Sequence, residues 1–219
     1  MTAFSGLLVP EISECQARGE FDRINRIVSR VFQSALAFSC GVSGIMLCFS
    51  DLLGEAIYHN AEAGTMIKAL APLIPVMYLD HIVDGMLKGL GEQLYSMKVN
   101  IADAALSVIL VYFLVPVWGV YGYVGIVIAM ELINASLSVG RLLSLTEVDI
   151  RLGKWLIKPL ICVILSTSIT GYITSRIVSA SGVLTLLSVS LSAIIYFILL
   201  RITGGINSDD VRWFKSAVK

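Results

Sequence analysis

The sequence predicts an all-α fold, a polytopic membrane helix bundle of six transmembrane helices. Hydrophobic residues make up 57% of the 219 residues and the mean hydropathy is +0.85, which is too apolar for a soluble domain of this length. Six stretches reach the ~20 apolar residues that a helix needs to cross a bilayer. Lys and Arg are concentrated in alternate gaps between these stretches, as in membrane proteins whose cytoplasmic loops retain positive charge.

Short polar or turn-forming segments separate the six predicted spans. The spans are Val31–Leu53, Met66–Leu87, Val99–Val115, Val120–Leu143, Trp155–Ile177 and Val183–Ile202. Before them, Phe4–Val9 has the composition of the end of a further membrane helix. Between that segment and the first span, four apolar residues recur at helical spacing, which predicts an amphipathic helix leading into the first span. These residues are Ile24, Ile27, Val28 and Val31.

The distribution of basic residues predicts the orientation. Fourteen of the sixteen Lys and Arg residues fall in four segments that we place on the cytoplasmic side: Pro10–Arg30, Lys88–Lys98, Arg141–Lys158 and Arg201–Lys219. The alternate, external segments are Asp51–Thr65, Pro116–Gly119 and Arg176–Gly182. Only Lys68 and Arg176 fall in or beside them. We therefore expect the C-terminus to be cytoplasmic.

Turn-forming residues support these boundaries. Pro116-Val-Trp118-Gly119 predicts a tight external hairpin with Trp118 at the lipid headgroups, and Gly204-Gly205 ends the last span. Ser208, followed by two acidic residues, predicts the start of a short amphipathic tail helix. The chain then divides into a junction at 1–30, four helices at 31–143, a cytoplasmic loop at 144–158, two further helices at 159–203 and a cytoplasmic tail at 204–219.

Ionisable residues inside the spans are the candidate functional residues, because an Asp at a helix centre costs about 2.5–3.5 kcal/mol to insert. At a rise of about 1.5 Å per residue, three consecutive spans share one polar layer roughly 10–15 Å from the cytoplasmic side. The layer comprises Asp80, His81, Asn100, Asp103, Glu131 and Asn134. Pro72 and Pro75 in the second span each remove a backbone donor, which predicts a helix kink.

Two interpretations of the polar layer are open at this point. In the first, the layer lines a water-filled cavity whose carboxylates hold a proton or Na⁺. In the second, it is a hydrated structural cluster in which His81 makes one interhelical hydrogen bond. Asp84 lies nearer the interface, where we expect it to pair with Lys88 at i, i+4.

The sequence carries no enzyme signature and no cofactor or metal motif. It has only two histidines, and it contains no H-E-x-x-H, no G-x-S-x-G and no glycine-rich phosphate loop. The four cysteines follow no metal or redox spacing. The net charge is zero, so nothing points to a nucleic-acid partner.

Three segments resemble the multidrug/oligosaccharidyl-lipid/polysaccharide exporter superfamily. LLVPEISECQARGEFDRI, from Leu7, is similar to its cytoplasmic LP-x-x-S…A-x-G-(D/E) junction. MLKGLGEQLYSMKVNIADAALSVILVYFLVP, from Met86, is similar to its helix ending in L-x-G-x-G followed by an Asn-bearing helix. VWGVYGYVGIVIA, from Val117, is similar to its glycine-patterned hairpin. The likeness is strongest to the stage V sporulation protein B and polysaccharide flippase branch, a relative of the lipid II flippases.

The resemblance implies a fourteen-helix fold of two six-helix lobes plus two extra helices, with both termini cytoplasmic. This chain would supply the last six helices, and Phe4–Val9 would end the eighth. It would be the C-terminal fragment of a flippase in a bacterial cell membrane. That flippase would export a lipid-linked saccharide, a peptidoglycan or polysaccharide precursor, by alternating access during cell-wall or spore-cortex synthesis. The implied partners are membrane lipid, the lipid-linked saccharide, a proton or Na⁺, and an N-terminal lobe from the same protein or a split-gene partner.

Two alternatives to the flippase are open. A multidrug/cation antiporter of the same superfamily would use the acids of the polar layer to carry its coupling ion. A non-transporting, truncated membrane fragment would serve at most as an assembly partner. No Lys or Arg lies at mid-membrane, although a lipid-pyrophosphate flippase is expected to line its cavity with cations. Such cations would then belong to the N-terminal lobe.

Overall fold

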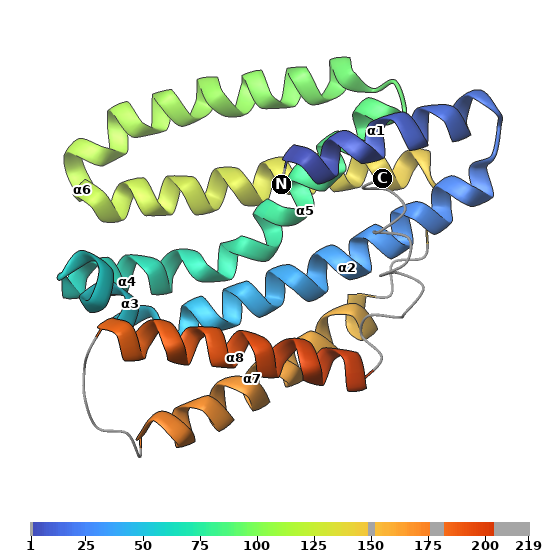
Figure 1. The fold of residues 1–219 in the computed structure, drawn as a ribbon. Coiled ribbons are helices and arrows are strands. Elements are labelled where there is room, and N and C mark those ends of the chain that lie inside the picture. The colour runs from blue at the N-terminus through green and yellow to red at the C-terminus, as the bar shows by residue number, and fades with distance from the viewer. Residues whose placement is uncertain (1, 149–151, 176–181, 204–219) are drawn as a thin grey trace. The chain divides into compact units, whose positions relative to one another are not determined.

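The computed structural model describes residues 2–148, 152–175 and 182–203 (Figure 1). Over these residues the chain is helical, with short connections and no strand, which confirms the all-α fold class. The predicted tail helix after Ser208 lies outside the described residues. The chain divides into two compact units, Met1–Ala35 with Val76–Ile150 and Leu36–Pro75 with Arg151–Lys219.

The first unit contains α1, the start of α2, nearly all of α5, and α6. Their bounds are α1 Thr2–Ala17, α2 Phe21–Cys48, α5 Ile74–Gly89 and α6 Gln93–Leu145. The amphipathic helix predicted before the first span is the beginning of α2. Its four apolar residues, Ile24, Ile27, Val28 and Val31, are all buried, whereas Arg23, Arg26 and Arg30 are exposed. Burial of one face therefore confirms this prediction.

Glycine ends α1 and α5 in the same way. Gly19 and Gly91 both adopt left-handed backbone angles, with φ of 70° and 76°, which a residue with a Cβ rarely adopts. After Gly91, the Glu92 N–H donates to the Leu87 carbonyl at 2.9 Å, and an equivalent bond follows Gly19. This pattern satisfies the last carbonyls of each helix and turns the chain sharply.

α6 is a helical hairpin. Gly119, with φ 59° and ψ −141°, departs from helical geometry, and the chain folds back there (Figure 1). The two arms contain the predicted spans Val99–Val115 and Val120–Leu143. Trp118, next to the turn, is 65% exposed. The turn at Gly119 confirms the predicted break between these two spans.

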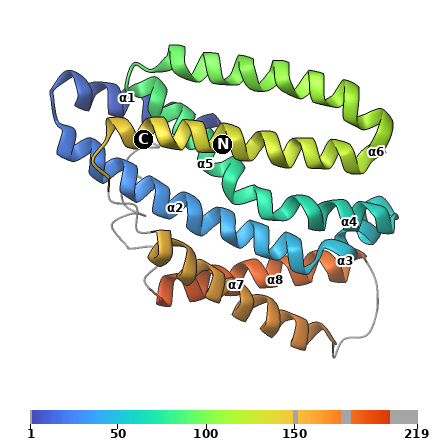
Figure 2. The same ribbon diagram turned by 180° about the vertical axis from the view of Figure 1, so that it is seen from behind.

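The second unit contains the end of α2 and five further elements. These are α3 Ser50–Tyr58, α4 Ala61–Leu70, the 3₁₀ helix η1 Ala71–Leu73, α7 Leu152–Ser175 and α8 Gly182–Ile202. α7 packs antiparallel against α8, and α3 contacts both α4 and α8 (Figures 1 and 2). The buried Tyr196 of α8 donates its hydroxyl to the Ala37 carbonyl of α2. Ala37, Tyr196 and Cys162 of α7 belong to one buried cluster, which joins the three helices.

The segment Asp51–Thr65, which was predicted to be an external loop, is largely helical. It contains most of α3 and the first turn of α4. The Asn60 side chain caps α4 by accepting the Glu62 N–H at 2.8 Å. Gly54 and Gly64 let the two helices approach closely, because a Cβ on Gly54 would lie 2.3 Å from the Gly64 nitrogen.

The two prolines of the second predicted span lie where the α-helix is interrupted by a 3₁₀ turn. Pro72 is in η1, which separates α4 from α5, and Pro75 is in the first turn of α5. N–H groups in the first turn of a helix have no partner within the helix, so proline is tolerated there. The path from Ala61 to Gly89 is therefore two α-helices joined by a 3₁₀ turn.

Three of the described helical segments are long and apolar enough to cross a membrane. They are Phe21–Cys48, Ala61–Gly89 and Gln93–Leu145, the last of which doubles back at Gly119. Two shorter apolar segments lie in α7 and α8, at Ile157–Ile173 and Leu187–Ile202.

Gly44→Ala tests the packing of α2 on α7. An added Cβ at Gly44 would lie 2.0 Å from Cγ1 of Val163, whose β-branched side chain has little rotamer freedom. We expect a loss of about 1–3 kcal/mol of unfolding free energy, measured as a lower Tm of the purified protein in detergent. Adding Val163→Ala removes the clashing methyl groups, so the double variant should be more stable than the sum of the single effects.

Gly171→Ala is the matched control, because an added Cβ on this glycine of α7 meets nothing within 4 Å. It should leave Tm unchanged or raise it. An equal loss of Tm in Gly44→Ala and Gly171→Ala would contradict the close packing at Gly44.

Candidate functional site

The junction between α1 and α5 joins the first two segments that resemble the exporter superfamily. The Ser13 hydroxyl donates to the Gly89 carbonyl at 2.9 Å, and the Gln16 side-chain amide donates to the Leu90 carbonyl at 3.1 Å. A Cβ on Gly89 would lie 2.9 Å from the Cβ of Ile12. The serine of the first motif and the glycine of the second therefore serve the same structural purpose: both allow α1 and α5 to cross closely.

The predicted polar layer lies in the first unit, on α5 and both arms of α6. Asp80 belongs to α5, Asn100 and Asp103 to the first arm, and Glu131 and Asn134 to the second. The Asn134 side-chain amide donates to the Asn100 side-chain oxygen at 3.3 Å, which joins the two arms. Ser138 donates to the Asn134 side-chain oxygen at 3.5 Å and also lies beside the Asp80 carboxylate. The structure thus connects residues from three predicted spans.

The acids of this layer interact electrostatically. Asp80, Asp103 and Glu131 are half-buried, and the charges of Asp80 and Asp103 act on Glu131. Carboxylates that share a low-dielectric environment repel one another unless a proton, a cation or water offsets their charge.

Two carboxylate oxygens in the layer have no hydrogen-bond partner. Oδ1 of Asp80 and Oδ1 of Asp103 are both buried and unpaired within the described structure. A buried polar atom without a partner costs about 1–3 kcal/mol, and more for a charged group. These atoms can accept a hydrogen bond from water or another donor, or contact a cation. Among the described residues, no three His, Cys, Asp or Glu side chains come together in a group that could hold a metal ion.

The remaining candidates differ in their exposure. His81 and Asn100 are exposed, whereas Asn134 is buried. Asp84 accepts a hydrogen bond from the Lys88 ammonium at 2.6 Å, so the predicted i, i+4 ion pair is confirmed. Asp84 is therefore ion-paired, whereas Oδ1 of Asp80 and Oδ1 of Asp103 have no hydrogen-bond partner within the described structure.

Sequence reasoning missed an ion pair between Glu92, the residue before α6, and Arg141 in the second arm of α6. The Arg141 guanidinium donates to both carboxylate oxygens of Glu92, at 2.8 and 3.3 Å, and it lies over the Tyr95 ring at 5.3 Å from the ring centroid. Tyr95 donates its hydroxyl to the Leu137 carbonyl at 3.3 Å. The predicted hairpin contained a signal for this pair, because Glu92 and Arg141 lie at similar distances along the chain from the turn.

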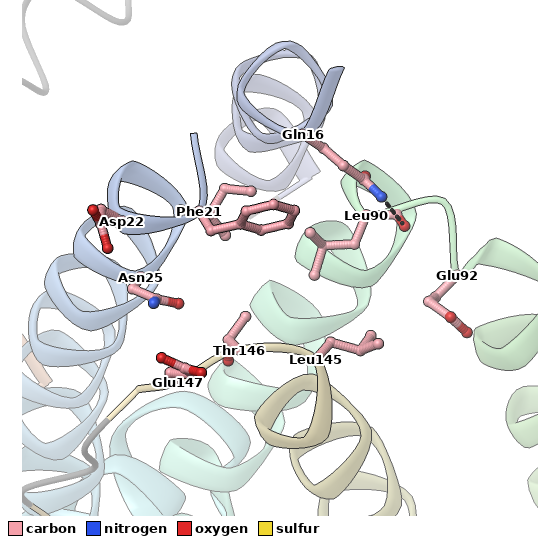
Figure 3. A pocket seen from close by; sticks show the side chains of 10 residues that line it. Gln16, Phe21, Asp22, Asn25, Leu90, Glu92, Leu145, Thr146 and Glu147 are labelled. Atoms are coloured by element: carbon pink, nitrogen blue, oxygen red, sulfur yellow. Dashed lines mark hydrogen bonds between the residues drawn. The ribbon is translucent and has the colours of Figure 1, made fainter. Parts of the chain in front are cut away.

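A pocket of about 390 Å³ lies next to this ion pair (Figure 3). Its walls come from the α1–α2 connection, the α5–α6 connection and the end of α6. Gln16 spans part of it to reach the Leu90 carbonyl, and Figure 3 labels Phe21 and Leu145 among its apolar residues. The acidic residues of the lining are Asp22, Glu92 and Glu147. No feature of the sequence pointed to this pocket.

Long apolar helices that carry a layer of acids and amides are typical of integral membrane proteins. Residues 8–113 match the model of the MatE family, whose members are membrane exporters of the multidrug/oligosaccharidyl-lipid/polysaccharide superfamily and are not enzymes. The matched range, a little less than half of the chain, includes Asp80 and Asp103 and ends before Glu131. No curated protein matches the chain.

Proposed function

We propose that this chain forms part of a flippase that exports a lipid-linked saccharide across a bacterial cell membrane by alternating access. The match of residues 8–113 to the MatE family of membrane exporters supports an export function. The likeness to the sporulation-protein and polysaccharide flippase branch supports a peptidoglycan or polysaccharide precursor as the substrate. The contact between Ser13 and Gly89 supports that likeness, because it joins two of the segments on which the likeness rests.

We further propose that a second helical lobe faces the polar layer. His81 and Asn100 are exposed although they lie in apolar helices, and polar groups at membrane depth need water or a polar partner. An anionic lipid-pyrophosphate substrate also requires cations, and the polar layer is acidic. The facing lobe would supply those cations, so that substrate binds between one acidic and one basic wall.

Translocation in proteoliposomes tests the flippase proposal. The chain is reconstituted with a candidate N-terminal lobe and a fluorescent lipid-linked saccharide, and an impermeant quencher reports the fraction of fluorophore on the outer leaflet. We expect the pair to exchange the lipid between leaflets much faster than either part alone. No exchange by the pair would contradict the flippase function, and full exchange by this chain alone would contradict the need for a second lobe.

One observation favours a multidrug/cation antiporter as the second candidate. Asp80, Asp103 and Glu131 lie in one layer, and the charges of Asp80 and Asp103 act on Glu131. Such a layer suits a cation better than an anion. Efflux of ethidium from the same vesicles, driven by a Na⁺ or proton gradient and without lipid exchange, would favour this candidate.

We also propose that the C-terminus and the four basic segments are cytoplasmic. A green fluorescent protein fused after Lys219 should therefore fluoresce in cells, and an alkaline phosphatase inserted after Asn60 should be active. The reason is the retention of Lys and Arg on the cytoplasmic side. An active phosphatase after Lys219 would contradict this orientation.

A further inference from the structure

Polar residues of the two α6 arms face each other in pairs. Glu92 binds Arg141 and Asn100 binds Asn134, and the charge of Asp103 acts on Glu131. The number of residues between successive pairs is nearly the same on the two arms, as expected for an antiparallel hairpin. These intervals are multiples of three or four residues, so all the members lie on one face of each arm.

Ser96 and Ser138 occupy the interval between the ion pair and the amide pair. Ser96 follows Glu92 and precedes Asn100 by one helical turn each, and the register places it opposite Ser138. Both serines are buried, with 4% and 5% of their surface exposed. We call the whole set the polar column: Glu92, Ser96, Asn100, Asp103, Glu131, Asn134, Ser138 and Arg141.

The Ser96 hydroxyl oxygen is buried and has no hydrogen-bond partner within the described structure. Serines in apolar helices commonly bond back to their own backbone, as Ser136 does to the Leu132 carbonyl at 2.6 Å. Ser96 does not. Buried hydroxyls without a protein partner are rare and usually bind an ordered water molecule. The unpaired oxygens of Asp80 and Asp103 are further positions of this kind, at the acid layer.

We propose that the polar column is a hydrated path from the Glu92–Arg141 end of the α6 hairpin to the acids Asp80, Asp103 and Glu131. Water molecules would bind at Ser96 and at the unpaired carboxylate oxygens. The bidentate Glu92–Arg141 pair, held by the Tyr95 ring, closes the outer end. This inference rests on the proposed transport function. The acids of an exporter must exchange protons or cations with the cytoplasm, and the path would allow that exchange.

Cysteine accessibility tests the path in the full chain. In inside-out vesicles, and with the four native cysteines replaced by alanine, Ser96→Cys and Ser138→Cys are exposed to Ag⁺, a small hydrated cation that binds thiols. Unreacted thiols are then counted by alkylation after denaturation. Ala135→Cys is the matched control, because Ala135 is similarly buried at 6% exposure and lies outside the polar column. We expect both serine variants to react at least tenfold faster than this control.

Opening the outer end gives a second readout. In the Ser96→Cys background, Arg141→Ala removes the closing side chain and should raise the reaction rate severalfold. Equal rates for Ser96→Cys, Ser138→Cys and Ala135→Cys would overturn the hydrated path, and an unchanged rate in Arg141→Ala would overturn the closing role of the ion pair. The labelling needs no transport substrate. A dry column in an active flippase therefore rejects only the path, and a hydrated column without lipid exchange rejects only the proposed function.

Discussion

Gly89→Leu is expected to abolish the packing of α1 on α5 and leave little folded protein. Even the first added carbon would lie 2.9 Å from Cβ of Ile12 and 3.1 Å from the Val9 carbonyl oxygen, and neither atom is the end of a flexible side chain. Overpacking by a methyl group costs about 1–3 kcal/mol, so we expect that loss for Gly89→Ala and a larger one for Gly89→Leu. The hydrogen bond from Ser13 to the Gly89 carbonyl would be lost as the helices separate.

Size-exclusion chromatography after heating, monitored by a fluorescent fusion, measures this effect as a shift of Tm. Gly140→Ala is the control, because its added Cβ meets nothing within 4 Å and alanine is the better helix former by about 0.5–1 kcal/mol. The two alanine variants should therefore shift Tm in opposite directions. Similar shifts in both would show that the crossing at Gly89 is not close.

Asp80→Asn and Asp103→Asn are expected to reduce transport at least tenfold while leaving membrane insertion intact. Each exchange keeps the shape of the side chain but removes the carboxylate, whose unpaired buried oxygen is available to a donor or a cation. Hydrogen bonds to charged groups contribute about 1.5–3 kcal/mol. A loss of that size in the transport barrier corresponds to about tenfold or more in rate.

Asp84→Asn is the matched control for these acids. Asp84 lies one helical turn from Asp80 on α5 but pairs with Lys88, so its replacement should lower transport much less. The measurement is the initial rate of lipid-linked saccharide exchange in proteoliposomes, normalised to the amount of inserted protein. Unchanged rates in both Asp80→Asn and Asp103→Asn would contradict a transport role of the polar layer.

Features that repeat along one helix were predictable from the sequence. The apolar stripe of α2 and the Asp84–Lys88 pair each depend on residues three to four positions apart, and the helical repeat alone brings such residues onto one face. The break at Gly119 was predictable for a similar reason, because glycine tolerates a positive φ. A shared membrane depth of Asp80, Asp103 and Glu131 stays a prediction, made by counting residues at a fixed rise per residue.

Contacts between helices could not be predicted from the sequence. The segment Asp51–Thr65 was predicted to be an acidic loop. It contains most of α3 and the start of α4, which pack together because the backbones at Gly54 and Gly64 approach closely. The Glu92–Arg141 pair and its pocket depend on the exact register of the two α6 arms, which the predicted hairpin indicates only approximately.

The sequence by itself determined the helical class and the approximate helix positions, and it predicted a shared depth for the acids, because each depends on spacing within a single helix. Only the tertiary structure decided which polar atoms find partners. Ser13 meets Gly89 and Asn100 meets Asn134, whereas the Ser96 hydroxyl and one oxygen each of Asp80 and Asp103 stay unpaired. The physical reason is that a hydrogen bond requires its two heavy atoms within about 3 Å of each other. Helix packing sets such distances between residues that are far apart in the chain.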